Sequence, residues 1–534
     1  MPMRAKLLIG ISTLSLLSCT GDVNTGDDAT PGGGGAGGSG ATAGAPGGAG
    51  TSGAAPGGAG SGGTSSGGRA GGSTGGAGAG AGGVTGGSGG GASGSAGAAA
   101  TAGTGGTSGA GAGAGGSAGG GGLPPTLGPR ITTTAVSVSG GVKEGVRNWS
   151  IWGQRDLVIA PVFTAPLADC TTLVCYTSGD EDAPTAHVVR LSAQDQLDQE
   201  LVTEPGVECR GLAAGEDGAF AALLWNDEDN ADPPVDTIAV HRYGADGSPV
   251  GRTELVNDDN HPTDFGLGES RLEYGDGRYG AYYHVHSLSG HEGDTLKWVD
   301  AASGAETTEW DWGCSHSMSN TLTYNASLGD FVSACVTDCY PGTDGDFETA
   351  SIGGVYLDNR RKVTDVAAGC NGDVAGELGS AAASPDGWKL VFNAHQAPTE
   401  LGQDSYDESS MNQDIAFASV NGDRMPGSVV FLTSTASVNE MDSSIALYMP
   451  EATEQYLVGW AEGEGDAYKL AVVDAAGAIL EAPLDVTATA RWGRRDDPFR
   501  KHHDGDVVWA WFDEPGSTTL NFTRVDAGVA YACE

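Results

Sequence analysis

The sequence predicts an all-β fold, a β-propeller of seven four-stranded blades, preceded by a disordered glycine-rich linker. Three observations predict it. Long amphipathic helices are missing, and short apolar or alternating runs are separated by Asp, Gly, Asn and Pro. A unit made of a turn and an apolar strand recurs at steps of 51 to 67 residues. A second unit, strand–turn–strand, occurs seven times, and seven repeats of this length are typical of a propeller.

The chain begins with an export signal. Arg4 and Lys6 precede an apolar run over residues 7–17, which is too short to span a bilayer as a helix. The run ends in Leu-Leu-Ser before Cys19, a string that resembles a bacterial lipobox. The resemblance implies that Cys19 accepts the lipid. Thr20 after it favours anchoring in the outer membrane, with the protein periplasmic or surface-exposed. The alternative is an ordinary signal peptide with an incidental cysteine.

Between the signal and the folded part lies a long tether. Residues 1–18 are the predicted lipoprotein signal peptide, and residues 19–122 carry the lipidated cysteine and the tether. From Pro31 to Gly122 there are 92 residues, of which 46 are glycine, and Arg69 is the only charged one. Such a segment buries too little apolar surface to offset its ordering entropy. We expect a flexible coil with a reach of roughly 50–60 Å, rather than a glycine-rich assembly segment.

Residues 123–534 form the predicted propeller domain, and this domain carries the whole charge excess. Outside it stand three basic and three acidic residues, so the net charge of −43 belongs to the domain. A surface of this sign repels nucleic acid and anionic lipid headgroups. No nucleic-acid partner is therefore expected, whereas Ca²⁺ is a possible ligand. A merely solvated acidic surface is the alternative.

The domain contains eight cysteines, an even number in an exported protein, which favours up to four disulfides. They are Cys170, Cys175, Cys209, Cys314, Cys335, Cys339, Cys370 and Cys533. Short spacing makes Cys170–Cys175 and Cys335–Cys339 possible local pairs, and Cys314 and Cys370 could join neighbouring repeats. A structural zinc site is the rival interpretation, although the spacings lack a C-x-x-C pair.

The recurring apolar strands follow Asp-Gly or similar turns. They begin near residues 219, 278, 330, 388, 455 and 506, and the run 170–178 fills the same place in a first repeat. The clearest copy is Ser384-Pro385-Asp386-Gly387 before an apolar strand. It resembles the turn-and-strand motif of TolB-type and WD-like propellers, which implies that fold. A pair of β-sandwiches and a β-helix are the rival folds; the regular step argues against the first and its length against the second.

Closure of the ring follows from the chain ends. The last strand–turn–strand copy runs from Leu520 to the C-terminal cysteine, so the chain is expected to end in an outer strand. Residues 130–162 then supply the first inner strand, with an extra strand that could pair onto the last blade. A disulfide from Cys533 to the first or second blade would tie the seam.

One histidine-rich strand is a candidate metal site. His284 and His286 share a face of a strand, and His291 or Glu292 would supply a third ligand. The alternative is that both histidines line a polar sheet face, since H-x-H alone is a weak pattern.

Acidic loops are candidate calcium sites. Asp227, Asp229 and Asp232 offer enough oxygen ligands for Ca²⁺, as does the stretch 344–346. Neither loop fits the EF-hand spacing, so solvated loops remain the alternative. No other cofactor is implied.

Catalytic signatures are missing, and no catalytic residue is assigned. There is no G-x-S-x-G, no P-loop and no dinucleotide-binding motif placed after a strand. Nine tryptophans could form a sugar-stacking floor or pack between blades: Trp225, Trp298, Trp310, Trp312, Trp388, Trp460, Trp492, Trp509 and Trp511.

Two functions remain open at this stage. The first is a membrane-tethered extracytoplasmic binding or scaffolding lipoprotein with a protein or glycan ligand. The second is a hydrolase or lyase of propeller type acting on extracellular glycans. Two or three carboxylates converging with an arginine or a bound metal at the channel mouth would favour the enzyme, and a mouth of small or mixed side chains would favour binding.

Overall fold

The computed structural model describes residues 126–528 and Cys533, with gaps. The gaps are 146, 151–152, 157–158, 181, 227–236, 257–268, 287–291, 314–318, 338–353, 359–360, 366–377, 395, 397–412, 450–453, 464, 466 and 494–498. The predicted signal peptide, Cys19 and the tether therefore lie outside the described residues.

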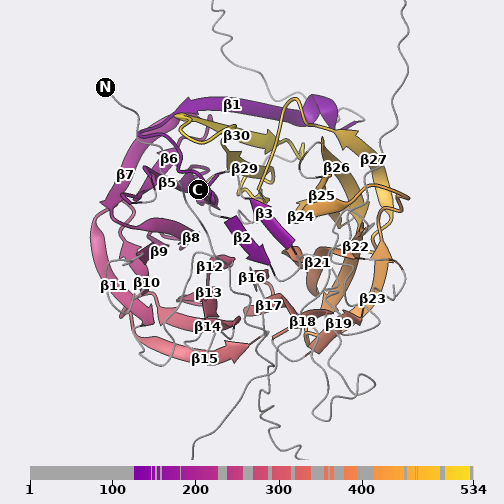
Figure 1. The fold of residues 1–534 in the computed structure, drawn as a ribbon, viewed down its shortest axis with the longest axis horizontal. Coiled ribbons are helices and arrows are strands. Elements are labelled where there is room, and N and C mark those ends of the chain that lie inside the picture. Colours follow the sequence, from indigo (N-terminus) through magenta and orange to yellow (C-terminus); the bar gives the residue numbers. More distant parts are fainter. Residues whose placement is uncertain are drawn as a thin grey trace, which may run out of the picture. The chain divides into compact units, whose positions relative to one another are not determined.

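The described strands form seven four-stranded antiparallel sheets, and these sheets are the blades of a ring (Figure 1). Blade 1 comprises β4 (Phe163–Pro166), β5 (Thr172–Ser178), β6 (Thr185–Leu191) and β7 (Leu197–Pro205). Blade 2 comprises β8 (Glu208–Ala214), β9 (Phe220–Asn226), β10 (Thr237–Tyr243) and β11 (Pro249–Val256). Blade 3 comprises β12 (Ser270–Gly275), β13 (Arg278–His286), β14 (Glu292–Asp300) and β15 (Glu306–Gly313).

The remaining blades follow in chain order. Blade 4 comprises β16 (Asn320–Asn325), β17 (Asp330–Thr337), β18 (Gly354–Leu357) and β19 (Arg361–Asp365). Blade 5 comprises β20 (Leu378–Ser384), β21 (Gly387–Ala394), β22 (Asp414–Asn421) and β23 (Pro426–Phe431). Blade 6 comprises β24 (Glu440–Met449), β25 (Gln455–Glu462), β26 (Ala467–Asp474) and β27 (Ile479–Asp485).

Blade 7 is built from both ends of the domain. It comprises β28 (Arg500–Lys501), β29 (Val507–Trp511), β30 (Thr519–Val525) and, on the outside, β1 (Ile131–Ser137). A 3-10 turn, η1 (Gly128–Arg130), precedes β1, and β2 (Arg147–Ser150) and β3 (Gly153–Asp156) form a separate hairpin. The seven-bladed all-β ring predicted from the repeats is thereby confirmed.

Packing between blades explains the strand patterns. The second strands, such as β5 and β21, are buried at every position because neighbouring blades cover both of their faces. The outer strands are largely exposed, as in β27. The hydrophobic core falls into seven clusters, one at each interface between successive blades. Each blade is therefore stabilised by its neighbours, as in other repeat folds.

The predicted Asp-Gly turns join the first and second strands. In the turn before β9, the backbone N–H of Ala219 donates to Asp217 Oδ1 at 3.1 Å. Gly218 has a φ of 80°, a conformation that favours glycine. The side-chain acceptor and the glycine together reverse the chain, so these turns set the start of each apolar strand.

Ring closure differs from the prediction in one respect. The expected outer strand at the C-terminal end is wrong for the described residues, because β30 is the third strand of blade 7. The outermost place is taken by β1, which pairs with β30 from Ile131 opposite Val525 to Ser137 opposite Thr519. The predicted extra strand pairing onto the last blade is thus confirmed. The prediction that residues 130–162 supply the first inner strand is wrong, because that strand is β4, which begins at Phe163. The ladder hydrogen bonds between β1 and β30 thus hold both ends of the domain in blade 7, and the chain continues from β1 to blade 1.

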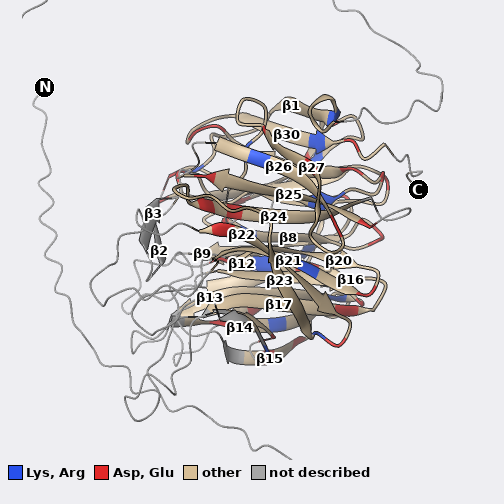
Figure 2. Cartoon of the chain, turned by 90° about the vertical axis from the view of Figure 1, so that its right-hand side faces the viewer, with Lys and Arg blue, Asp and Glu red and all other residues tan. Residues whose placement is uncertain are grey.

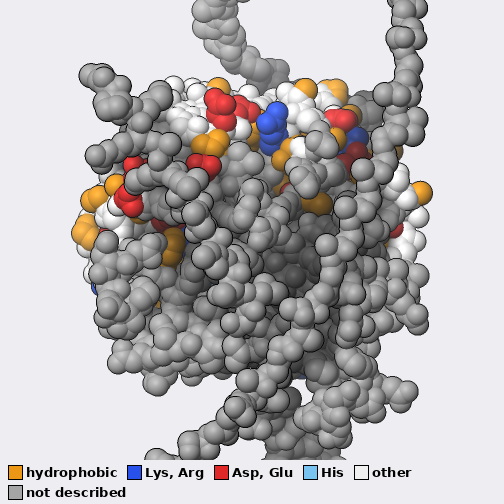
Figure 3. All heavy atoms as spheres, in the orientation of Figure 1, with side chains coloured by type: hydrophobic (Ala, Val, Ile, Leu, Met, Phe, Trp, Pro, Cys, Tyr) orange, Lys and Arg blue, Asp and Glu red, His pale blue; other side chains and the backbone are white. Residues whose placement is uncertain are grey.

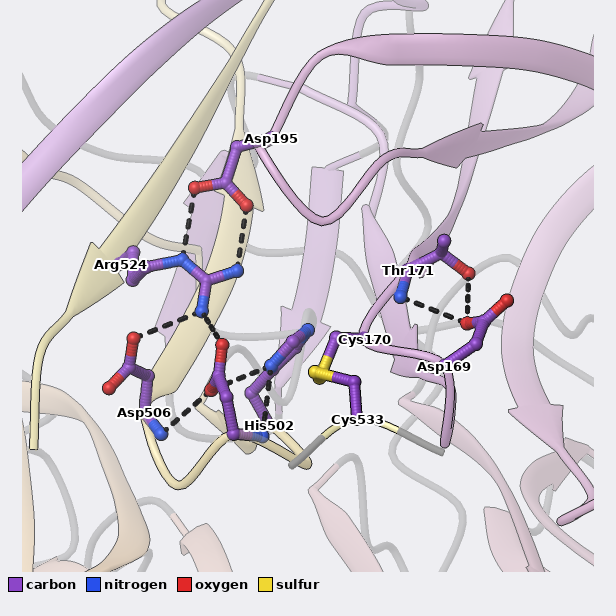
Figure 4. The surroundings of a disulfide bond; sticks show 9 residues. Asp169, Cys170, Thr171, Asp195, His502, Asp506, Arg524 and Cys533 are labelled. Carbon is purple, nitrogen blue, oxygen red and sulfur yellow. Dashed lines mark hydrogen bonds and ion pairs between the residues drawn. A yellow bond between two sulfur atoms is a disulfide. The ribbon is translucent and has the colours of Figure 1, made fainter. Parts of the chain in front are cut away.

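A disulfide also closes the seam (Figure 4). Cys533 bonds to Cys170 in the β4–β5 turn, with a Cα–Cα distance of 5.4 Å. This confirms the predicted bond from Cys533 to the first or second blade. A second disulfide joins Cys175 in β5 to Cys209 in β8, so it links blades 1 and 2.

The local pair Cys170–Cys175 is therefore wrong, because each cysteine lies closer to a partner from another part of the ring. Cys335 is also disulfide-bonded. Cys314, Cys339 and Cys370 lie outside the described residues, so the predicted pairs that involve them stay predictions.

An ion-pair network accompanies the disulfide at the seam. Arg524 in β30 donates from Nη2 and Nε to the two carboxylate oxygens of Asp195 in blade 1, at 2.7 and 3.0 Å. It also donates to Asp504 and, as Figure 4 shows, to Asp506, both in the β28–β29 turn. One guanidinium therefore connects three carboxylates from the two blades that meet at the seam.

Two faces of the ring are named from the direction of the inner strands β4, β8, β12, β16, β20, β24 and β28. We call the face of the ring at which these strands begin the start face, and the face at which they finish the end face.

Acidic residues gather at strand ends and turns in the side view (Figure 2). Described acidic side chains are also visible around the rim of the ring viewed as in Figure 1 (Figure 3). Within the described residues, no helix has the length and apolarity needed to cross a membrane.

Candidate functional site

A cavity of about 490 Å³ opens where the inner strands finish, at the end face of the central channel. Every blade contributes to its lining. The lining residues are Thr164–Pro166, Leu212–Ala214, Glu273–Tyr274, Thr323–Ser327, Ala381–Pro385, Ile445–Leu447 and Phe499–Lys501. Ring geometry alone brings these positions together, because each inner strand presents its last residues to the common axis.

Small side chains make up much of the cavity wall. Ala165, Ala213, Ala382 and other alanines leave space along the axis, and Tyr274 and Tyr324 add aromatic surface. The described charged side chains in the lining are Glu273, Arg500 and Lys501. The wall therefore combines apolar surface, hydroxyl groups and a few charges, which is the usual composition of a small-molecule site.

An ion pair crosses the channel at this cavity. Arg500 Nη1 in blade 7 donates to Glu273 Oε2 in blade 3 at 3.0 Å. The Tyr324 backbone N–H approaches the other carboxylate oxygen at 3.4 Å. Among the ion pairs between described side chains, this one joins blades that are not neighbours. Both side chains keep 18–19% of their surface exposed, so the pair remains accessible from the cavity. Sequence reasoning missed it, since no local pattern relates residues 227 positions apart.

The start face holds a second group of charges, which is buried. Glu208 and Arg210 open β8, and Glu269 and Arg271 lie at the same places of the next repeat. Arg210 Nη2 donates to Glu208 Oε2 at 2.9 Å, and Arg271 Nη2 donates to Glu269 Oε2 at 3.3 Å. Lys143 adds a third cation, 2.9 Å from Glu208. All five residues are at most 5% exposed. The E-x-R string that occurs in two successive repeats is the sequence signal that would have found them.

Two buried carboxyl groups near the start face have altered proton affinity. Burial raises the pKa of Glu440 to about 7; the nearby Asp414 carboxylate adds to this, and a hydrogen bond from the Thr433 hydroxyl opposes it. Burial also raises the pKa of Asp294 to about 8, although the Tyr282 hydroxyl donates to it at 2.8 Å. Neither carboxyl was singled out in the sequence.

The predicted metal ligands map onto one hairpin of blade 3. His284 is 1% exposed in β13, and His286 lies two residues further along the same strand. Glu292 begins β14 directly opposite His286, whereas His291 lies outside the described residues. The cluster of metal-ligand type that the described side chains form elsewhere contains Cys170, His502 and Asp504. The Cys170 sulfur is in a disulfide, so it is no ligand there.

The predicted calcium loops, with Asp227, Asp229 and Asp232 in one and residues 344–346 in the other, lie outside the described residues.

The interpretation that the tryptophans form a sugar-stacking floor is wrong for seven of the nine. Trp225, Trp298, Trp388, Trp460, Trp492, Trp509 and Trp511 are at most 8% exposed. They pack between blades, as in the edge-on contact of Trp492 with Trp509 at a centroid distance of 5.9 Å. Trp310 is partly buried and contacts Tyr282 edge-on, and the side chain of Trp312 is not described. Large rings are needed to fill the gaps between blades, which removes them from the solvent.

Comparison with known proteins shows similarity in fold. No protein-family model and no curated protein matches the sequence. The sialidase of Trypanosoma rangeli in complex with 2,3-difluorosialic acid aligns at 10% identity and a TM-score of 0.36, over 76% of this chain and 60% of the sialidase chain. A DUF4221 family member from Bacteroides vulgatus aligns at 8% identity and a TM-score of 0.32, over 74% and 97% of the two chains.

An endo-arabinase from Bacteroides thetaiotaomicron aligns at 14% identity and a TM-score of 0.28, over 58% of this chain and 89% of that one. This chain thus spans about 60% of the length of the trypanosomal sialidase chain.

Proposed function

We propose that this chain is an exported, lipid-anchored binding protein whose propeller holds a small saccharide in the cavity at the end face. The observation that carries the proposal is the ion pair between Glu273 and Arg500, which stands partly exposed in a cavity formed by all seven inner strands. The cavity volume of about 490 Å³ falls in the range of small-molecule sites. The kinship with TolB-type propellers indicated by the Ser384–Gly387 turn is part of this proposal.

The chemistry of the wall favours a polyhydroxylated ligand. Tyr274 and Tyr324 offer ring surface on which a sugar can stack, and Thr323 and Ser327 are among the hydroxyl groups. Glu273 accepts hydrogen bonds and Arg500 donates them. A sugar hydroxyl can therefore donate to the first and accept from the second. A partly exposed ion pair exchanges its partners for a ligand at lower cost than a fully buried one.

Binding is favoured over glycan hydrolysis at this cavity. Glycosidases place two carboxyl groups on either side of the bond that they cleave. Among the described lining residues, Glu273 is the one carboxylate, and Arg500 already pairs with it. A charge-compensated carboxylate in a wall of small side chains supports recognition rather than acid–base chemistry.

Calorimetric titration of the full chain with neutral and uronate-containing mono- and disaccharides tests this function. We expect measurable binding to at least one of these sugars, and Arg500→Ala and Glu273→Gln should weaken it at least tenfold. Arg491→Ala is the matched control, because Arg491 is exposed and its Nη1 lies 4.0 Å from Asp513, away from the cavity. Equal affinity in the wild type and in both cavity variants would rule out the assigned site.

Anchoring through Cys19 is a separate part of the proposal. The lipobox-like string and the tether support it, because two or more acyl chains give stable membrane attachment. Replacing Cys19 with Ser should move the protein from the membrane fraction to the soluble fraction. Continued membrane attachment of Cys19→Ser would show that the lipid assignment is wrong.

A glycan hydrolase is the second candidate, and Glu440 is the observation in its favour. A carboxyl group with a pKa of about 7 has the proton affinity that a general acid needs at neutral pH. Glu440 opens the inner strand β24 at the start face, close to Asp414. A hydrolysis screen on polysaccharides in which Glu440→Gln abolishes turnover would favour this candidate over binding alone.

A further inference from the structure

The two disulfides whose partners are both described have different surroundings. Cys175 and Cys209, which link blades 1 and 2, are both 0% exposed and belong to one hydrophobic cluster. At the seam, Cys170 is also buried, but its partner Cys533 is exposed. A thiol from solution can therefore reach the seam disulfide in the folded protein, whereas the other disulfide is reached only after blades 1 and 2 separate.

A histidine and a carboxylate lie against the seam disulfide (Figure 4). A ring nitrogen of His502, a carboxylate oxygen of Asp504 and the Cys170 sulfur all lie within 4.8 Å of one another. The His502 side chain is completely buried, and its Nδ1 lies 2.7 Å from Asp504 Oδ1. His502 follows β28 of blade 7, and Cys170 lies in the β4–β5 turn of blade 1. Closure of the ring therefore brings a histidine–aspartate pair to one of the two sulfur atoms.

Asp504 fixes the orientation of the imidazole. Burial opposes its ionisation, but its hydrogen bond with His502 and the neighbouring positive charges outweigh this and hold the pKa of Asp504 at about 2. An ionised carboxylate only accepts hydrogen bonds, so Nδ1 of His502 donates to it. The Asp504 backbone N–H also approaches Nδ1, at the longer distance of 3.4 Å. The other ring nitrogen, Nε2, is buried and has no hydrogen-bond partner among the described groups. It is therefore the atom that can take up a further proton and make the ring cationic.

We propose that the Cys170–Cys533 bond is a site of thiol–disulfide exchange, in which Cys533 is attacked and Cys170 leaves. The thiolate of a small thiol forms a bond to the Cys533 sulfur while the original bond between the two sulfurs breaks. The electron pair stays on Cys170, whose thiolate then takes a proton from the imidazolium or from water. The incoming thiol is oxidised to a mixed disulfide, and Cys170 is reduced. A thiolate beside a protonated histidine is a better leaving group.

The charge of the domain favours a cationic thiol as the reactant. The net charge is −43, and the exposed Asp169 directly precedes Cys170. A negative field raises the local concentration of small cations and lowers that of anions. A small thiol that carries an ammonium group should therefore react faster than one that carries a carboxylate.

Exchange removes the crosslink without removing the other bonds at the seam. The ladder between β1 and β30 remains, and so do the hydrogen bonds from Arg524 to Asp195. The closed ring can therefore carry the incoming thiol on Cys533. This reaction goes beyond the saccharide binding proposed above.

The test uses the full chain with Cys19→Ser, so that no thiol from the N-terminal region takes part. The native protein is treated with cysteamine, quenched with acid at intervals, alkylated and mapped by mass spectrometry. We expect Cys170–Cys533 to open at least about tenfold faster than Cys175–Cys209, with cysteamine on Cys533 and the alkyl group on Cys170. In strong denaturant the two disulfides should open at similar rates. Equal rates in the native protein would overturn the proposal, and an adduct mainly on Cys170 would overturn the direction of attack.

His502→Gln tests the part played by the imidazole. It should slow the opening of Cys170–Cys533 roughly tenfold, because the leaving thiolate loses its cation. A merely structural role predicts the opposite sign, since a loosened seam would open faster. His241→Gln is the matched control: its Nδ1 lies 3.1 Å from Glu204 in another part of the ring, and its rate should equal that of the wild type. An unchanged or faster rate in His502→Gln would show that His502 does not assist the exchange.

A comparison of two thiols tests the preferred charge. Cysteamine should react faster than 3-mercaptopropionate at low ionic strength, after correction for their thiolate fractions, and added salt should reduce the difference. Equal rates at low salt would overturn the assignment to cationic thiols. Saccharide titration of the same protein reports separately on the cavity, so failure of either proposal can be recognised without the other.

Discussion

The seam of the ring and the channel cavity use charged residues in different ways. At the seam, Arg524 makes hydrogen bonds with Asp195, Asp504 and Asp506, and its side chain is 13% exposed. In the cavity, Arg500 forms an ion pair with Glu273, and the two side chains are 18–19% exposed. The seam network joins adjacent blades beside a disulfide, whereas the cavity pair reaches across the channel. The guanidinium of Arg524, which three carboxylates hold, stabilises closure, whereas the Arg500–Glu273 pair lines the cavity, where a ligand can reach it.

Among the changes that test this comparison, removing the seam disulfide should reduce the stability of the fold the most. The Cys170–Cys533 bond spans 363 residues of sequence, so it restricts the unfolded chain over most of the domain. We expect the double variant Cys170→Ser/Cys533→Ser to lose roughly 3–5 kcal/mol of stability. Denaturant unfolding followed by tryptophan fluorescence measures the loss. An unchanged midpoint would show that β1 and the ion pairs close the ring without the disulfide.

Replacing Arg524 with Ala tests the ionic part of the seam. The variant leaves three carboxylates together without their cation, and we expect a loss of about 2–4 kcal/mol at pH 7. The loss should be smaller near pH 3, because protonation then removes the repulsion between these carboxylates. Arg491→Ala, at an exposed pair, is the control and should change stability by less than about 1 kcal/mol. A loss that does not depend on pH would contradict the ionic explanation.

Glu440 allows a test of how stability depends on pH at a site away from the seam. Its pKa is raised from 4.5 to about 7 by burial, so the folded protein takes up a proton at this site more readily than the unfolded chain. The stability that this proton contributes is present below about pH 4.5 and is lost as the pH rises toward 7. Glu440→Gln should remove this part of the pH dependence, so that its stability relative to the wild type increases from pH 4 to pH 8. A constant difference over that range would show that burial does not raise this pKa.

The cavity pair should have the smallest effect on stability. A partly exposed ion pair contributes little, so Arg500→Ala and Glu273→Gln should each cost about 1 kcal/mol or less. Thermal unfolding at neutral pH measures this, beside the larger loss in ligand affinity expected for the same variants. A cost as large as that of Arg524→Ala would mean that the pair is a structural crosslink of the ring rather than a binding element.

The strands of the blades were predictable because their signals are local. The apolar run in β21 follows Asp386-Gly387, and the same arrangement occurs in β9 and β29. Alternation of apolar residues and turn-forming Asp-Gly pairs act within a few residues, so the order of strands can be followed along the chain. The E-x-R string at Glu208 and Glu269 was equally local, but it was not recognised as a repeat.

The candidate sites depended on contacts that no local pattern contains. His284 and His286 were selected from their spacing, yet only the register of β13 with β14 shows that Asp294 lies directly opposite His284. Cys170 and Cys175 are close in sequence, but each is bonded to a cysteine in another part of the ring. In both cases the distance along the chain was a poor guide to the distance in space.

By itself, the sequence determined the class of the protein: an acidic seven-bladed β-propeller, after a glycine-rich segment and a predicted export signal. Repetition and turn chemistry are properties of short segments, and they are readable without knowing which blades meet. Only the tertiary structure decided that β1 completes blade 7, that Cys533 bonds to Cys170, and that Arg500 reaches Glu273 across the channel. Closing a ring brings together residues that are hundreds of positions apart, and their pairing depends on the geometry of all seven blades at once.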